Sequence, residues 1–248
     1  MKILKYKKKR NGEYELQLDS GMELSLYEEV ILQFELLLKK DIDDAYLEDI
    51  LLVNQKYDVY YVALKSLKSR FKSAFELREF LLKKEYPLEY VEEAIKKLLK
   101  QGYLDDRSFA KAYINTQMIT TSKGPKKIEK ELLDKGVSTD IISEELEVFN
   151  KEEQVLRIEK VANRLVKTNR SRGGVVLRKK ITCDLQNLGY GISIINEVLS
   201  AFDFGDTKDI AKKEAEKLYH RLSRKYSGKE LEFKIKEKLY QKGLYYED

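Results

Sequence analysis

The sequence predicts a mainly α-helical protein in which tandem three-helix repeats follow a small antiparallel β-meander. Three observations predict this class. Charged residues make up 37% of the 248 residues and proline occurs only twice, which is typical of helix-rich chains. Hydrophobic residues recur at helical spacing over most of the chain. One pattern of aliphatic residues and glycines also returns four times, at intervals of 51, 53 and 54 residues.

The first 26 residues predict the meander. Residues 2–9 alternate in polarity, and Asn11-Gly12 is the dipeptide that a two-residue type I′ hairpin requires. The return strand covers residues 13–18, and a turn at residues 19–21 leads to a third strand at residues 22–26. Three strands are too few to be stable alone, so we expect the sheet to pack on the helices that follow.

Two helices are predicted between the meander and the repeats. Ser25 followed by Glu28 fits a capping box, and Val30, Ile31 and Phe34 continue from it at helical spacing. A second helix is predicted over residues 44–67. We therefore group residues 1–67 as an N-terminal region with a meander and helices.

Each repeat is anchored by one aliphatic residue: Leu77, Ile128, Ile181 and Ile235. A leucine follows four residues later in every copy, and the eighth position is Glu85, Gly136, Gly189 or Gly243. A glycine there predicts a helix that ends in the left-handed conformation, with the leucine contacting the next hydrophobic residue. In the first copy Glu85 replaces glycine, so we expect a looser stop or one that uses Pro87.

A second helix follows each stop, and a longer third helix fills the rest of each period. We expect these third helices from Asp105-Asp106 onward, over residues 152–165 and over residues 208–222. On this division the repeats cover residues 68–120, 121–170 and 171–225, and residues 226–248 form a partial fourth copy. The chain either ends naturally on a half unit or has been shortened.

Catalysis is not expected. A single histidine, His220, and a single cysteine, Cys183, cannot build a metal site, and we interpret Cys183 as a core or boundary residue. Asp105 and Asp106 could be read as metal ligands of a hydrolase, but a role at a helix start explains them. We predict no enzymatic activity, no cofactor and no metal. The lack of a long apolar run and of a disulfide predicts a cytoplasmic protein without a membrane segment, and we expect a monomer.

Basic residues give the better functional indication. Residues 1–67 carry 10 basic and 13 acidic side chains, whereas residues 164–183 carry seven basic side chains and no acid. The start of the second repeat, Lys123-Gly124-Pro125, brings cations and backbone N–H groups together as a phosphate site would. A solvated charged surface is the alternative interpretation. The candidate binding residues are Arg70, Lys72, Lys123, Lys126, Lys127, Arg164, Lys167, Arg170, Arg172, Arg178, Lys179 and Lys180.

The repeats resemble the RecX family of bacterial regulatory proteins. Three segments carry the resemblance: RFKSAFEL at residues 70–77, GYLDDRSFAKAY at residues 102–113, and KGPKKIEKELLDKGV at residues 123–137. The likeness covers residues 68–248, and the meander resembles the N-terminal extension of longer members from Gram-positive bacteria. Lys72-Ser73 stands where the family usually has Arg-Thr, which keeps the charge but not bidentate recognition.

The resemblance implies an elongated, curved array that binds the RecA filament on single-stranded DNA. It further implies inhibition of strand exchange and ATP hydrolysis, in the setting of homologous recombination, DNA repair and the SOS response. The alternative hypothesis is a helical repeat protein that binds single- or double-stranded DNA independently of RecA. This alternative predicts tight binding to DNA alone, with an affinity that falls steeply as salt rises.

Overall fold

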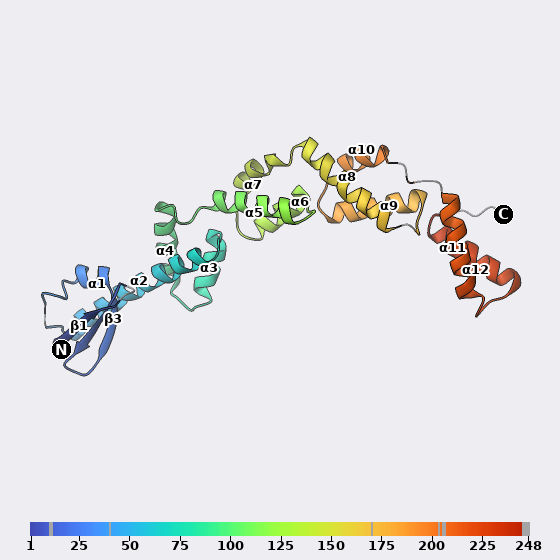
Figure 1. The fold of residues 1–248 in the computed structure, drawn as a ribbon. Helices are drawn as coiled ribbons and strands as arrows, with labels where there is room; N and C mark the ends of the chain where they lie inside the picture. The colour runs from blue at the N-terminus through green and yellow to red at the C-terminus, as the bar shows by residue number, and fades with distance from the viewer. Residues whose placement is uncertain (10–11, 40, 170, 203, 205–206, 245–248) are drawn as a thin grey trace. The chain divides into compact units, whose positions relative to one another are not determined.

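The structure, a computed structural model, describes residues 1–9, 12–39, 41–169, 171–202, 204 and 207–244. Figure 1 shows the order of the elements along the chain. The chain divides into two compact units. The first comprises residues 1–109 and 135–137, and the second comprises residues 110–134 and 138–248. Each unit is built mainly from helices, as predicted, and in the described ranges no helix is long and apolar enough to cross a membrane.

The predicted meander is confirmed in the first unit (Figure 1). Strands β1 (Ile3–Lys8), β2 (Glu13–Leu18) and β3 (Glu23–Tyr27) pair in the antiparallel order β1-β2-β3. Gly12 has a φ of +90°, as a hairpin glycine should, while Asn11 lies outside the described residues. The sheet packs on α1 (Glu28–Gln33) and the first half of α2 (Asp44–Ser69) through one hydrophobic core, which includes Leu16, Leu18, Leu26, Val30, Ile31 and Ile50.

The capping box predicted at Ser25 is wrong. Ser25 lies within β3 and donates its hydroxyl to Glu13 Oε2 across the sheet at 3.0 Å. Helix α1 begins at Glu28 without a side-chain cap. The capping box is instead at α3 (Ala74–Leu82), where the Ser73 side chain accepts from the Glu76 N–H and Glu76 returns the contact. Both sites have the serine–x–x–glutamate spacing, and pairing of Ser25 in the sheet decides between them.

A tyrosine cluster joins the sheet to the helices of the first unit. Asp58, on α2, accepts hydrogen bonds from Tyr27 at 2.8 Å and from Tyr86 at 2.5 Å. Burial and the bond to Asp58 raise the pKa of Tyr86 to about 12. Tyr27 also stacks on Tyr61, with ring centroids 4.7 Å apart. One carboxylate therefore ties the end of β3 and the segment before α4 (Leu88–Lys100) to the same helix.

The remaining helices continue the repeat. They are α5 (Asp106–Thr120), α6 (Pro125–Leu133), α7 (Thr139–Glu145), α8 (Lys151–Thr168), α9 (Gly174–Asn187), α10 (Ile192–Ser200), α11 (Thr207–Leu222) and α12 (Gly228–Gln241). The long helices α5, α8 and α11 lie where the sequence predicts third helices, within a few residues. A short 3₁₀ turn, Leu146–Val148, extends α7.

The hydrophobic cores group two short helices with the long helix that precedes them. One core joins Val59 and Ala63 of α2 to α3 and α4, and another joins α8 to α9 and α10. The division drawn on the sequence, for example at residues 68–120, attaches the long helix that follows. A repeat pattern defines the period but not the residue at which a copy begins, because only packing shows which long helix covers which pair.

The glycine stops have the predicted conformation. Gly136, Gly189 and Gly243 have φ values of +73°, +95° and +69°. The residues that follow Gly189 and Gly243 donate their N–H groups to Leu185 and Leu239, as expected for a Schellman stop. Glu85 adopts the same left-handed conformation, with φ +63°, and Pro87 occupies the N-cap position of α4 without a side-chain hydrogen bond.

Each glycine stop also packs on the first short helix of the preceding copy. A Cβ on Gly136 would lie 2.4 Å from Phe75 Cβ, one on Gly189 would lie 2.5 Å from the Lys127 nitrogen, and one on Gly243 would lie 2.7 Å from the Gly173 oxygen. Glycine is therefore required twice, for its φ and for its lack of a side chain. The exposed Glu85 side chain is tolerated because no earlier copy precedes the first repeat.

Candidate polyanion-binding surface

The helix start predicted to bind phosphate is a junction between copies. The Gly124 N–H donates to the Leu188 carbonyl at 2.7 Å, and the Lys126 N–H donates to the Gly189 carbonyl at 3.2 Å. The equivalent Gly173 N–H donates to the Lys242 carbonyl at 3.3 Å. These N–H groups are not available to a phosphate, so the backbone part of the prediction is wrong. Only the side chains around the junctions can meet a polyanion.

Arg70 and Lys72, the cations before the first repeat, make contacts within the fold. Arg70 is exposed, and its guanidinium lies 3.8 Å from Glu76. Lys72 Nζ lies 3.5 Å from the Ser66 carbonyl and 5.3 Å from the centre of the Phe80 ring. Lys72 therefore contributes to local packing at the end of α2, and Arg70 is the more accessible charge of the pair.

The three lysines at the start of α6 differ in their availability. Lys123 is paired with Glu131 at 2.7 Å. Burial opposes ionisation of Glu131, but hydrogen bonds from Lys123 and Tyr113 outweigh it and lower the pKa of Glu131. Lys127 is exposed, with its Nζ 3.4 Å from the Asn187 carbonyl. Lys126 is exposed, and its ammonium group is uncommitted among the described residues. A polyanion would therefore meet Lys126 and Lys127 rather than Lys123.

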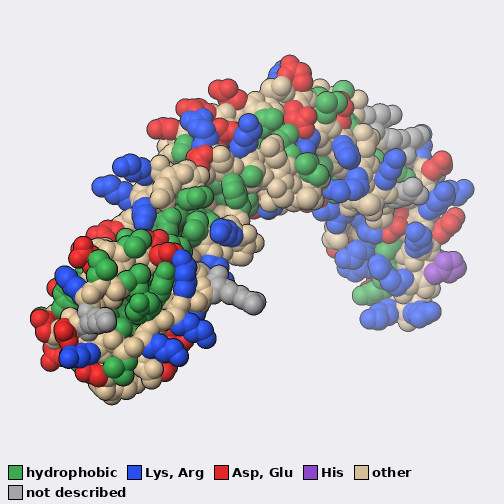
Figure 2. Space-filling view, turned by 60° about the vertical axis from the view of Figure 1, so that its left-hand side comes forward, with side chains coloured by type: hydrophobic (Ala, Val, Ile, Leu, Met, Phe, Trp, Pro, Cys, Tyr) green, Lys and Arg blue, Asp and Glu red, His purple; other side chains and the backbone are tan. Residues whose placement is uncertain are grey.

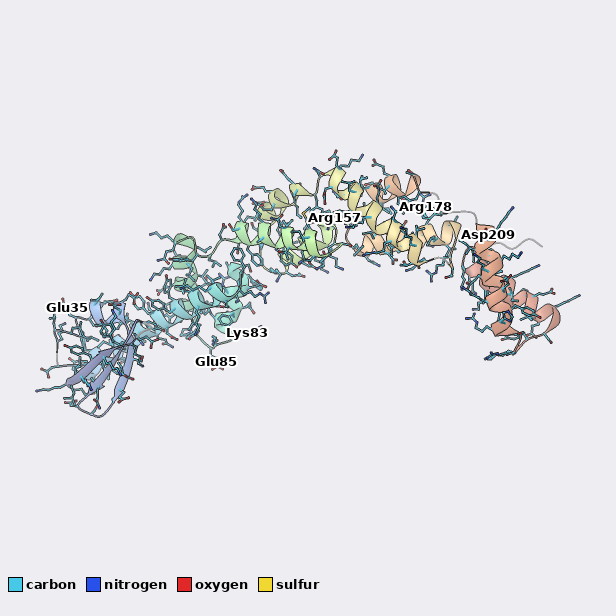
Figure 3. All side chains as sticks on the ribbon, viewed as in Figure 1. Glu35, Lys83, Glu85, Arg157, Arg178 and Asp209 are labelled. Atoms are coloured by element: carbon cyan, nitrogen blue, oxygen red, sulfur yellow. The ribbon has the colours of Figure 1, made fainter. Side chains whose placement is uncertain are left out.

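Helix α9 presents a similar arrangement one period later. Arg178 and Lys179 are exposed, while Lys180 pairs with Asp184 at 2.9 Å (Figure 3 labels Arg178). Lys179 and Lys126 each precede their repeat anchor by two residues, so they occupy equivalent helix positions. Cations at equivalent positions of successive copies produce a repeating charge, which suits a polymer whose own charge repeats.

Helix α8 carries a row of cations, of which the sequence predicts only Arg164 and Lys167 as binding residues. Arg157, Lys160, Arg164 and Lys167 follow one another at intervals of three or four residues, which places them on one face of the helix. Lys160, Arg164 and Lys167 are exposed. Arg172, just beyond the helix, is half-buried, and Arg170 lies outside the described residues. The three-four spacing of α8 was the signal that could have identified this row.

Arg157 has a structural role within that row. Its guanidinium donates to the carbonyls of Met118 at 3.0 Å and Thr121 at 2.9 Å, at the end of α5. Arg157 is labelled in Figure 3. A cation there satisfies carbonyls that a helix end leaves unpaired. Beside it lies a cleft of about 250 Å³ whose lining includes Lys160, Arg164 and the 85% exposed Ile119. The cleft brings Lys160 and Arg164, which pair with no carboxylate among the residues that the structure describes, next to an apolar side chain.

The residues considered for chemistry have other roles. Asp105 accepts from the N–H groups of Arg107 and Ser108, and its pKa is lowered chiefly by the Ser108 hydroxyl. Asp106 accepts the Ala74 N–H at 2.8 Å. Cys183 is exposed rather than part of a core, because its position on α9 faces solvent. His220 is exposed beside Tyr219. No group of metal-ligating side chains occurs within the residues that the structure describes.

A β-sheet head, tandem three-helix units and exposed cations at repeating positions define a helical-repeat protein with a surface rich in exposed cations. Family models for the first and second three-helix domains of RecX match residues 60–98 and 105–146. A regulatory protein RecX from Listeria welshimeri is 32% identical over 100% of this chain and 94% of its own length. One from Bacillus velezensis is 31% identical over 97% and 93%. The chain belongs to the RecX family of regulatory proteins.

Solved structures show the same relationship. A crystal structure of regulatory protein RecX superposes with a TM-score of 0.72 at 27% identity, covering 80% of this chain and 98% of the other. That of RecX from Lactobacillus salivarius gives 0.57 at 25% identity, covering 60% and 96%. The family resemblance inferred from the three sequence segments is confirmed. Each domain match also contains a long-helix segment followed by two short helices: residues 60–98 begin within α2, and residues 105–146 begin at the start of α5, in agreement with the packing.

Proposed function

We propose that this chain is a non-enzymatic regulator that binds the filament formed by RecA on single-stranded DNA and inhibits its recombinase and ATPase activities. Membership of the RecX family supports the regulatory role. The proposed binding surface rests on one observation: α6, α8 and α9 hold exposed cations that pair with no carboxylate in the described part of the chain. These cations are Lys126, Lys160, Arg164, Arg178 and Lys179. The protein acts as a cytoplasmic monomer in this proposal.

The cations would act by position as well as by charge. A filament repeats its phosphates and its protein surface along its axis, and Lys126 and Lys179 repeat with the helical copies of this chain. Each neutralised phosphate releases bound counterions, which adds a favourable, salt-dependent contribution to binding. The half-buried ion pairs Lys123–Glu131 and Lys180–Asp184 support the fold beneath this surface and are not part of it.

The test is RecA ATPase activity on single-stranded DNA at increasing concentrations of the chain. We expect the wild type to reduce ATP hydrolysis. The triple variant Lys126→Ala, Arg178→Ala, Lys179→Ala should require a concentration higher by about tenfold or more, because three charge contacts are lost. Circular dichroism should be unchanged, since all three side chains are exposed.

A charge-matched control separates this surface from net charge. Lys83, Lys96 and Lys100 are exposed in the first unit, and their replacement by alanine removes the same three charges. The control should inhibit like the wild type. Equal loss in both triple variants would refute the assignment of the surface. An ATPase rate that does not change at any concentration of wild-type chain would refute the RecA partner.

The second candidate is DNA binding without RecA, because the same exposed cations would contact phosphates of free DNA. Filter binding or fluorescence anisotropy with single-stranded DNA, with and without RecA, distinguishes the two. Binding to the preformed filament alone supports the first proposal. Tight binding to bare DNA together with an unaffected ATPase supports the second.

A further inference from the structure

The cleft at the end of α5 combines exposed apolar surface with positive charge, and it lies wholly within the second unit. Ile119, which is 85% exposed, lies beside the half-buried Met118 and the buried Val161. Lys160 and Arg164 supply the charge, and none of the lining residues in the described part of the chain is acidic. The cleft therefore favours a ligand that has both an apolar part and negative charge.

Arg157 holds the backbone around Ile119 in place. Its guanidinium donates to the carbonyls of Met118 and Thr121, which lie on either side of Ile119 in the sequence. Glu153 lies 3.4 Å from the same guanidinium and partly balances its charge. The cleft is therefore preformed, and a ligand would meet its positive charge chiefly at the two exposed cations. Binding to a preformed site loses little free energy to the ordering of the protein.

The cations of the cleft continue as a row along α8. Lys160, Arg164 and Lys167 are exposed and follow one another after four and three residues, which corresponds to steps of about 4.5 to 6 Å along a helix. Figure 2 shows hydrophobic side chains exposed among lysine and arginine side chains on the visible face of the second unit. A polymer with a negative charge on every unit can follow such a row and place one unit in the cleft.

A single-stranded nucleic acid has both required features in every unit. Each nucleotide carries one phosphate and one base, and the flat faces of an unstacked base pack on apolar side chains and on guanidinium groups. In a duplex these faces are stacked on one another and cannot reach Ile119. The cleft, at about 250 Å³, is smaller than the usual site of a drug-sized ligand, so it suits a single base rather than a helix of a partner protein.

We propose that the cleft between the end of α5 and α8 takes up one unstacked base of a single-stranded nucleic acid. Ile119 covers a face of the base, and Lys160 and Arg164 bind the adjoining phosphates. This inference rests on the assignment of these two cations to the binding surface, which both candidate functions share. It adds a contact to the base, which the cations alone do not provide.

Two labelled oligonucleotides test the proposal on the full chain without RecA. One is a single strand of thymidines, and the other has the same length and phosphates but abasic sites in place of its bases. Fluorescence anisotropy should show the abasic strand binding about tenfold more weakly, because the cleft loses its occupant. The ratio should persist as salt rises, since the base contact neutralises no charge. Equal affinities, or no measurable binding of the thymidine strand, would overturn the proposal.

Variants of the chain locate the base. Ile119→Ala should weaken binding of the thymidine strand by about fivefold and leave binding of the abasic strand unchanged, because only the first strand has a base to lose its contact. Ile119 is exposed, so the variant keeps the fold. Leu156→Ala is the matched control, because Leu156 is on α8, is 62% exposed and does not line the cleft. If Leu156→Ala weakens binding of the thymidine strand as much as Ile119→Ala does, the cleft is not the site.

Two further measurements separate the base from charge and from other ligands. Replacing Lys160 and Arg164 together by alanine should weaken binding of both strands by the same factor, because both strands keep their phosphates. An acidic peptide that carries leucines should not displace the thymidine strand. Displacement by this peptide at a lower concentration than by unlabelled thymidine strand would assign the cleft to a protein segment and overturn the proposal. RecA ATPase is measured separately, so a failure to inhibit it would refute the regulatory role and leave the result with bare strands intact.

Discussion

Glu85 shows how one residue adapts a repeated position to its place in the chain. Its φ of +63° is strained for a residue with a side chain, and the later copies relieve this strain with glycine. Those glycines are also enclosed by the preceding copy, whereas Glu85 is exposed. The first copy therefore retains the left-handed backbone conformation, but its stop has no neighbouring copy that would exclude a side chain.

The strain at Glu85 leads to a stability prediction. Glu85→Gly removes the unfavourable left-handed conformation and adds some backbone entropy to the unfolded chain, so we expect a net gain of about 1 kcal/mol. Urea unfolding monitored by circular dichroism measures it. Glu85→Ala keeps a Cβ and serves as the control, with little change in stability. A loss of stability in Glu85→Gly would contradict the strain argument.

At the scale of elements, the glycine stop and the helix start form one joint. The stop ends the first short helix of one copy. Its backbone carbonyls accept hydrogen bonds from N–H groups at the start of the first short helix of the preceding copy. Leu188 accepts from Gly124 in this way, and Gly189 accepts from Lys126. The same groups would otherwise be unpaired at both helix ends. The joint therefore explains why positions that look like anion-binding starts in the sequence are closed in the fold.

Substitutions at two glycines can separate the free-energy cost of a left-handed backbone from the cost of disturbing the joint. Gly102 has a φ of +72° with open space around its Cβ position, and Gly189 has a φ of +95° with the Lys127 nitrogen 2.5 Å away. We expect Gly102→Ala to cost about 1 kcal/mol, from the backbone alone. Gly189→Ala should cost at least about 2 kcal/mol more, because the joint must shift. Equal losses in urea unfolding would mean that the contact at Gly189 contributes little.

At the scale of the whole molecule, charge is distributed unevenly along the chain. Residues 1–67 hold more acidic than basic side chains, and residues 164–183 hold seven basic ones and no acid. Of the exposed cations on α6, α8 and α9, Arg164, Arg178 and Lys179 belong to the second of these populations, while Lys126 lies at the α6 start and Lys160 earlier in α8. Binding to a polyanion should therefore depend on this part of the chain and on ionic strength.

The salt dependence can be predicted. Contacts to single-stranded phosphates contribute about 0.7 each to the slope of log affinity against log salt. Removing Lys126, Arg178 and Lys179 together should reduce the slope for the RecA–DNA filament by about 2. The Lys83, Lys96 and Lys100 triple variant should leave the slope unchanged. An unchanged slope in the first variant would mean that these cations do not contact phosphate.

Much of the fold was predictable because it depends on neighbours in sequence. Hydrophobic spacing gave the long helix of residues 44–67, the meander and the positions of the later helices, and the glycine offsets gave the stops. Ser25 was misassigned because sheet pairing with Glu13 competes with a local cap. The candidate cations could be listed from the sequence, but their ion-pair partners, such as Glu131 for Lys123, could not.

The sequence by itself determined the period, the left-handed stops and the concentration of charge, since each depends on residues within a few positions of one another. Only the tertiary structure decided which long helix belongs to which pair, that the Gly124 and Lys126 N–H groups are already bonded, and that Ile235 is only partly buried. The bonds between copies join residues more than sixty positions apart, such as Gly124 and Leu188, where local spacing carries no information about the partner.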